Sequence, residues 1–99
     1  MTEPLTAETF VPHVNKVFRV KESGHALTLS GVELRPMDER ELAALGRQSF
    51  TLIFAGPPGN VLRDGLYTLE IGGGPAFQLY VIPIRTFARD RQDYQSVFN

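Results

Sequence analysis

Few side chains in this sequence have the residue type and spacing that catalysis or metal binding requires. His13 and His25 are the two histidines, and they lie twelve positions apart with no cysteine anywhere in the chain. A zinc site that can be recognised from sequence needs ligands paired at short spacing. We therefore expect structural roles and no metal site. His25 should lie in a turn beside Ser23, and His13, after Pro12, at the surface or against an N-terminal turn.

The hydroxyl and carboxylate groups also lack a catalytic context. No G-x-S-x-G sequence surrounds Ser30, Ser49 or Ser96. Two carboxylates, or a histidine and an acid, could still be paired by the fold, because such pairing is spatial. The glycines at 72–74 lack the Lys-Ser/Thr and the helix that follow a phosphate-binding loop, so they predict a hairpin tip. We expect no enzymatic activity and no cofactor.

The side chains best suited to contact another molecule lie between positions 85 and 94. This segment contains three arginines around one phenylalanine: Arg85, Phe87, Arg89 and Arg91. Arginines interleaved with aromatics can bind phosphates or stack on bases, and both residue types are enriched at protein interfaces. Asp90 and Asp93 partly cancel the positive charge, which disfavours nucleic acid. We expect either a solvated loop or, as the candidate binding site, a protein-interaction patch formed by these four residues.

The composition limits the classes of protein further. The chain has 99 residues, 10 Lys and Arg against 11 Asp and Glu, a net charge of −1, and no cysteine. This length predicts a single domain over 1–99, and the balanced charge predicts neither a nucleic-acid nor a membrane partner. Disulfides and cysteine-based metal sites are excluded. The start Met1–Pro4 has no basic flank and no apolar stretch, so we expect no signal peptide and a cytoplasmic protein.

Six strand-sized segments must position these groups. They are apolar or alternating runs separated by Gly, Pro, Asn and Asp, at 17–20, 26–35, 50–55, 66–71, 77–84 and 94–98. Several short strands with turn signals between them are typical of all-β domains. The predicted fold is therefore all-β and mainly antiparallel, a small six-stranded barrel or sandwich with one short helical element. The last segment ends the chain, so we expect an edge strand that is open to pairing.

Alternation assigns the faces of these strands. Phe50, Leu52 and Phe54 should face the core, as should Phe77, Leu79 and Val81 in the fifth segment. The opposite face of the fifth segment is not very polar, which predicts a strand that is central or covered on both sides. In the second segment, Leu27 and Leu29 are out of phase with Val32 and Leu34. One extra residue at Ser30-Gly31 would bring them into phase. We predict a β-bulge there, with Gly31 supplying the permissive backbone.

Two segments do not have strand patterns. Residues 6–10 can form one helical turn with Thr6 as the N-cap, ended by Pro12. Residues 38–46 can form a short helix between an Asp38 cap and Gly46, or a solvated hairpin loop. If this second helix forms, Leu42 and Leu45 should rest on the sheet, because two turns are too few to be stable alone.

The second half of the chain carries four motifs. They are F-x-L-x-F-x-G-P at 50–57, G-x-Y-x-L-E at 65–70, F-x-L-Y-V-x-P at 77–83 and Y-x-x-x-F-N at 94–99. With these motifs the chain resembles a family of short bacterial domains of unknown function, of about its own length, although the run Ile-Gly-Gly-Gly at 71–74 departs from the family pattern. The resemblance implies a β-rich fold and occurrence near phage-tail-like proteins, and it supplies no catalytic residue.

These observations favour a non-enzymatic structural or assembly module that acts through its surface. Its partner would be another protein or a second copy of the chain, in a phage-tail-like or other multi-protein assembly. The alternative is a small-ligand-binding β-barrel in which Phe54, Tyr67 and Tyr80 line a mouth.

Overall fold

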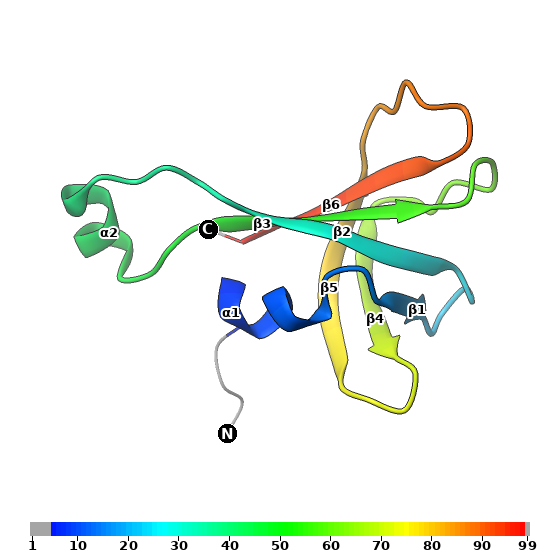
Figure 1. Ribbon diagram of the computed structural model, residues 1–99, viewed down its shortest axis with the longest axis horizontal. Coiled ribbons are helices and arrows are strands. Elements are labelled where there is room, and N and C mark those ends of the chain that lie inside the picture. The colour runs from blue at the N-terminus through cyan, green and yellow to red at the C-terminus, as the bar shows by residue number, and fades with distance from the viewer. Residues whose placement is uncertain (1–4, 99) are drawn as a thin grey trace.

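The computed structural model describes residues 5–98 as one β-barrel with a projecting arm (Figure 1). Met1 to Pro4, on which the expected lack of a signal peptide rests, and Asn99, the last residue of the terminal motif, lie outside the described residues. The six strands are β1 (Val17–Val20), β2 (Ala26–Leu34), β3 (Phe50–Gly56), β4 (Gly65–Ile71), β5 (Ala76–Pro83) and β6 (Gln92–Phe98).

The strands form one closed antiparallel sheet in the order β1-β2-β3-β6-β5-β4. Pairing of β1 with β4 joins the two ends of the sheet, in a register that places Phe18 opposite Ile71. The predicted all-β fold is confirmed, and of its two forms the structure adopts the barrel rather than the sandwich. The predicted strands are all present; the largest shift is in β6, which begins two residues earlier than expected.

Alternating side chains fill the barrel. In β3 every second residue from Phe50 to Gly56 is buried, as predicted from the sequence pattern. The interior is packed with apolar side chains from all six strands and from the segments that close its ends: Ala7, Phe10, Phe18, Val20, Leu27, Leu29, Phe50, Leu52, Phe54, Leu62, Leu69, Leu79, Val81 and Tyr94. Burial of these side chains is the main stabilising contribution to the fold.

The predicted bulge in β2 is confirmed. Leu29 lies opposite Phe54 and Gly31 opposite Ile53, so Ser30 is the extra residue. The prediction about Gly31 was wrong, because its φ is not positive and a Cβ there would meet no atom within 4 Å. Ser30 is exposed and takes up the register change without help from a glycine. Beyond the bulge, β2 and β3 continue together out of the barrel.

An N-terminal segment closes one end of the barrel. Helix α1 (Ala7–Phe10) begins after Thr6 and continues directly into the 3-10 helix η1 (Val11–His13). The expectation that Pro12 ends the helix was therefore only partly right, since Pro12 lies in the first turn of η1, where a missing N–H costs nothing. Phe10 packs into the barrel end, with its ring centroid 4.9 Å from that of Phe77.

The surroundings of strands β5 and β6 differ in part from those predicted. Of the two alternatives for β5, the structure shows a central strand, because β5 pairs with β4 on one side and with β6 on the other. Its outward face is open to solvent, with Tyr80 exposed, so the strand is not covered on both sides. Strand β6 is not an edge strand, because it pairs with β3 along its whole length and with β5 at Gln95 and Tyr94. The strand order is the reason, because β6 inserts between β3 and β5 and so has a neighbour on both sides. The glycines at 72–74 form the β4–β5 hairpin tip, as predicted.

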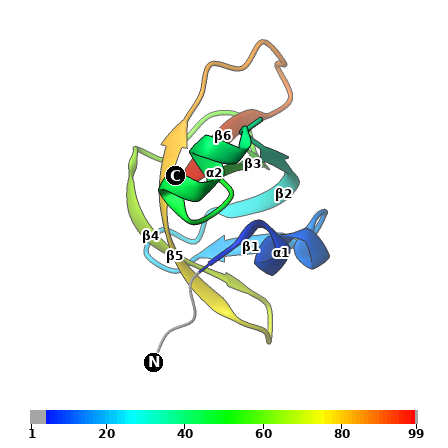
Figure 2. The same ribbon diagram turned by 90° about the vertical axis from the view of Figure 1, so that its left-hand side faces the viewer.

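The arm is formed by Gly31–Leu34 of β2, by Phe50–Ile53 of β3 with the paired end of β6, and by residues 35–49, which carry helix α2 (Glu39–Leu45) at its tip. The helix begins at Asp38, which accepts a hydrogen bond from the Glu41 N–H at 2.8 Å, and ends at Gly46 with φ of 70°. The helical alternative for 38–46 is confirmed. Figure 1 shows that α2 projects beyond the barrel, and in Figure 2 the helix lies in front of it, toward the viewer.

Leu42 and Leu45 do not rest on the sheet, and that expectation was wrong. Both side chains are exposed, at 43% and 45%, because α2 lies past the end of the strands that they were expected to cover. Capping at both ends and the arm's polar contacts hold the helix instead. No helix among residues 5–98 has the length and apolar character that crossing a membrane would require.

Candidate protein-interaction site

The predicted interaction patch lies on the loop that joins β5 to β6, which rises above the barrel in Figure 1. Hydrogen bonds fix the base of this loop. The Thr86 hydroxyl donates to the Ile84 carbonyl at 3.1 Å and accepts from the Asp93 N–H at 2.8 Å, and Gln92 Nε2 donates to the same Ile84 carbonyl at 2.8 Å. The tip of the loop is therefore carried on a stem that the two strands hold in place.

Phe87 stands at this tip and is the most exposed large apolar side chain described, at 87%. Arg85 lies over its ring, with the guanidinium carbon 5.4 Å from the ring centroid. This cation–π contact gives the ring a preferred orientation. An arginine and an aromatic ring displayed together are the side chains that most often contribute binding energy at protein interfaces.

The two other arginines of the patch do not join this pair. Arg91 Nε donates to Asp93 Oδ1 at 2.8 Å. The hydrogen bond from Arg91 to the carboxylate, followed by the attraction between the charges, raises the Arg91 pKa above its ordinary value. Within residues 5–98, no hydrogen bond or ion pair connects Arg89 to the rest of the patch. The structure thus brings together Arg85 and Phe87, and it places Arg89 and Arg91 separately on the same loop.

His25 makes a connection between loops that the sequence pattern did not indicate. Its Nε2 donates to the Asn60 carbonyl at 2.8 Å, because a carbonyl only accepts, and its Nδ1 shares a hydrogen bond of 2.5 Å with the Ser23 hydroxyl. The β1–β2 turn is thereby tied to the loop after β3. His25 has the structural role in a turn that we expected, but its partner Asn60 is distant in sequence and is brought near by the antiparallel pairing of β2 with β3.

His13 packs inward rather than lying at the surface. Its ring is half-buried and meets Phe18 edge-on, with centroids 6.4 Å apart, and lies 6.2 Å from Phe77. Its Nδ1 atom is buried and has no hydrogen-bond partner among the described residues. His13 therefore belongs to the aromatic group at the barrel end, beside the N-terminal helices.

The described residues form no recognisable catalytic or metal centre. Between residues 5 and 98, no three His, Asp or Glu side chains lie close enough to hold a metal ion together. Ser49, just before β3, and Ser96, in β6, are buried, and Ser30 lies at the bulge. Within residues 5–98, none of these three serines forms a hydrogen bond with a histidine.

The three aromatics expected at a barrel mouth are not gathered in one place. Phe54 is fully buried in the core. The Tyr67 hydroxyl donates to the Arg63 carbonyl at 2.7 Å, while Tyr80 lies on the outer surface, with its hydroxyl 3.4 Å from Asp64 Oδ2. Their alternation along the strands places them on different faces. A ligand mouth built from these three residues is thus inconsistent with the structure.

A hollow instead lies between the N-terminal helix and the arm. It has a volume of about 990 Å³ and lies between the two segments at 5–8 and 45–48 and the ends of β3 and β6. Its apolar lining consists of Leu5, Ala7, Leu45, Phe50, Val97 and Phe98. Sequence reasoning missed this groove because its walls come from three segments that are far apart in the chain.

Together these features define a small closed antiparallel β-barrel with an arm and an exposed loop that displays Arg85 and Phe87. The chain belongs to the family described as a domain of unknown function (DUF6916), whose family model matches residues 5–98. This agrees with the resemblance to a family of short domains of unknown function. Searches among curated proteins and among solved structures give no match.

Proposed function

We propose that this domain is a non-enzymatic interaction module that binds another protein through the loop between β5 and β6. The observation that carries the proposal is the exposure of Phe87, 87% in solvent beneath the Arg85 guanidinium. An exposed aromatic side chain on a loop with a hydrogen-bonded stem loses little conformational entropy when a partner covers it. The assembly that the sequence motifs suggest is a phage-tail-like particle or another multi-protein complex.

The test compares two truncations of exposed apolar side chains. Phe87→Ser removes the displayed ring, and Leu66→Ser makes a similar change on the outer face of β4, where Leu66 is also exposed. Proteins from the source cell that co-purify with the wild-type domain should be depleted about tenfold or more by Phe87→Ser, the loss typical of an aromatic hot spot. They should be retained by Leu66→Ser. Equal retention by both variants would contradict the proposal.

The alternative function is the binding of a small apolar or amphipathic molecule, and one observation favours it. The groove between α1 and the arm has a volume near the upper end of the range found for ligand pockets, about 300–1,000 Å³. This site would replace the aromatic mouth that the sequence suggested.

Helix α2 supplies a matched pair of variants for the groove. Leu45 lines the groove, while Leu42, on the same helix and equally exposed, does not. If the groove binds apolar molecules, the dye anilinonaphthalene sulfonate should fluoresce with the wild-type protein, and Leu45→Ser should weaken its binding several-fold because one apolar wall is lost. Leu42→Ser should leave the binding unchanged. A dye signal that is absent, or that both variants reduce equally, argues against the groove.

A further inference from the structure

One edge of the arm has no strand beside it. Strand β1 pairs with β2 only as far as Thr28, and the Lys16 carbonyl then accepts from the Leu29 N–H at 3.0 Å. Beyond the bulge, Gly31–Leu34 pairs with β3 on one side. In the part of the chain that the structure describes, no strand pairs with the other side of this segment.

The hydrogen-bond pattern shows which groups face this open edge. The Arg35 N–H donates to the Ser49 carbonyl at 3.0 Å, and the register continues with Glu33 opposite Thr51. Backbone groups of successive residues in an antiparallel strand point alternately to the two sides. Because Glu33 and Arg35 bond toward β3, the N–H and C=O groups of Val32 and Leu34 point outward, where they can accept another strand.

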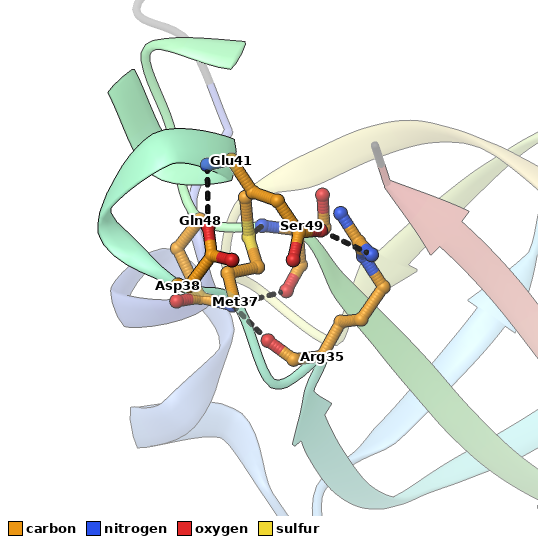
Figure 3. A network of polar contacts seen from close by, with 6 residues as sticks. All are labelled: Arg35, Met37, Asp38, Glu41, Gln48 and Ser49. Atoms are coloured by element: carbon orange, nitrogen blue, oxygen red, sulfur yellow. Dashed lines mark hydrogen bonds and ion pairs between the residues drawn. The ribbon is translucent and has the colours of Figure 1, made fainter. Parts of the chain in front are cut away.

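Polar contacts at the tip of the arm hold this edge in shape (Figure 3). Gln48 Nε2 donates to the Arg35 carbonyl at 2.6 Å and to the Ser49 carbonyl at 2.8 Å. Arg35 Nη1 lies 3.0 Å from Glu41 Oε2, which ties the end of β2 to helix α2. The strand edge is therefore organised before any partner arrives, which lowers the entropy cost of binding.

We propose that this edge pairs with the same edge of a second copy of the chain, antiparallel, about a two-fold axis through Leu34. In this register Leu34 faces Leu34, and Glu33 of each copy faces Arg35 of the other. The two Leu34 residues exchange a pair of backbone hydrogen bonds, and the Val32 N–H reaches the Pro36 carbonyl of the other copy. Pro36 has no N–H to donate, so the pairing ends there.

The charges of Glu33 and Arg35 favour a second copy of the chain as the partner and determine this register. Centring the pair on Glu33 would place two carboxylates directly opposite each other, which is unfavourable. Centring it on Leu34 places opposite charges in both outer positions, a pattern that is complementary to itself. Arg35 retains its contact with Glu41 on other guanidinium donors, since both side chains remain about half exposed.

The apolar face of the arm also favours the pairing of two copies through Leu34. Leu34 lies beside Phe50 in the register, and the Phe50 ring stacks on Phe98 with centroids 4.5 Å apart. Leu34, Phe50 and Phe98 thus form one row across β2, β3 and β6. Leu34 is the outermost residue of this row and is 59% exposed in the single chain. Pairing through Leu34 joins the two rows into one apolar face across six strands and covers both leucines.

Charge reversal tests the pairing, with sedimentation equilibrium from micromolar to millimolar protein as the readout. The wild-type chain should show a monomer–dimer equilibrium. Glu33→Arg and Arg35→Glu, each placed in a Glu41→Gln background so that no new repulsion arises within the arm, should each weaken the dimer about tenfold or more. Combining the two reversals, or mixing the two single variants, should restore association to within a few-fold of the Glu41→Gln protein.

Glu39→Arg is the control, because Glu39 lies on α2 away from the edge and the change in charge is the same. It should leave the dimer unchanged, and all variants should melt as the wild-type monomer does. A wild-type chain that stays monomeric at every concentration overturns the proposal, as does failure of the combined reversal to restore association. The Phe87→Ser variant separates this surface from the proposed function, since it should dimerise normally.

Discussion

Phe10→Ala is expected to lower the free energy of unfolding by about 3–5 kcal/mol, the loss typical of truncating a buried phenylalanine. Phe10 is fully buried although it belongs to a four-residue helix near the start of the chain. Its ring contacts Phe50, Phe77 and Phe98, with centroids 6.1, 4.9 and 5.8 Å away. A helix this short has no stability of its own, so removing the ring should also release α1 from the barrel.

Chemical denaturation with urea, followed by circular dichroism, measures the loss. Phe87→Ala is the matched control, because it deletes the same atoms from an exposed position and should change stability by less than about 0.5 kcal/mol. Amide exchange should show faster exchange in residues 7–13 of the Phe10 variant than in the wild type. A loss below about 1 kcal/mol would show that the N-terminal segment is not part of the core in solution.

The barrel itself could be predicted because strand periodicity depends on local sequence. Side chains alternate in every strand, so the phase difference between Leu29 and Val32 was enough to predict the bulge at Ser30 before the partner strand was known. The same periodicity gave the core face of β3. Closure was not predictable in this way, since the pairing of β1 with β4 depends on contacts between residues far apart in the chain.

The surroundings of each element were harder to predict than its existence. The Asp38 cap and the terminal Gly46 indicated a helix correctly, because capping is local. Nothing local indicates that β2 and β3 extend beyond the barrel, so Leu42 and Leu45 were wrongly expected on the sheet. Strand β6 was expected at an edge for the same reason: the end of the chain was visible in the sequence, while its two neighbouring strands were not.

The candidate site shows the same division between local and long-range information. Exposure of Phe87 was predictable from the arginines and turn residues around it, and its contact with Arg85 lies within two residues. The groove, the open edge of β2 and the link from His25 to Asn60 each depend on segments that meet only in the folded barrel. Contact surfaces of this kind need the three-dimensional register, because no single segment carries their pattern.

The loop and the arm project from different parts of the barrel, as both ribbon views show (Figures 1 and 2). Pairing through Leu34 would therefore leave both copies of Phe87 open to other partners. A dimer that displays two such loops binds a repeated partner with increased avidity, since the second contact becomes intramolecular. The proposed interaction module and the proposed dimer thus support each other while resting on separate residues.

Gly56→Ala is expected to lower the free energy of unfolding by about 1–3 kcal/mol through overpacking. Gly56 is the last residue of β3, and a Cβ there would lie 2.8 Å from Leu27 Cδ2 and 3.2 Å from Tyr94 Cε1. Both neighbours are buried in the core. The Tyr94 ring cannot move aside freely, because its hydroxyl accepts a hydrogen bond from the Leu62 N–H at 3.0 Å.

Gly31→Ala is the matched control for this substitution, since its Cβ would meet no atom within 4 Å and its φ is not positive. The two variants make the same chemical change in neighbouring strands of one sheet, so the loss of glycine's backbone freedom is common to both. Urea denaturation should therefore show a stability close to wild type for Gly31→Ala and a clear loss for Gly56→Ala. Equal losses would mean that backbone conformation, and not the contact with Leu27 and Tyr94, limits both positions.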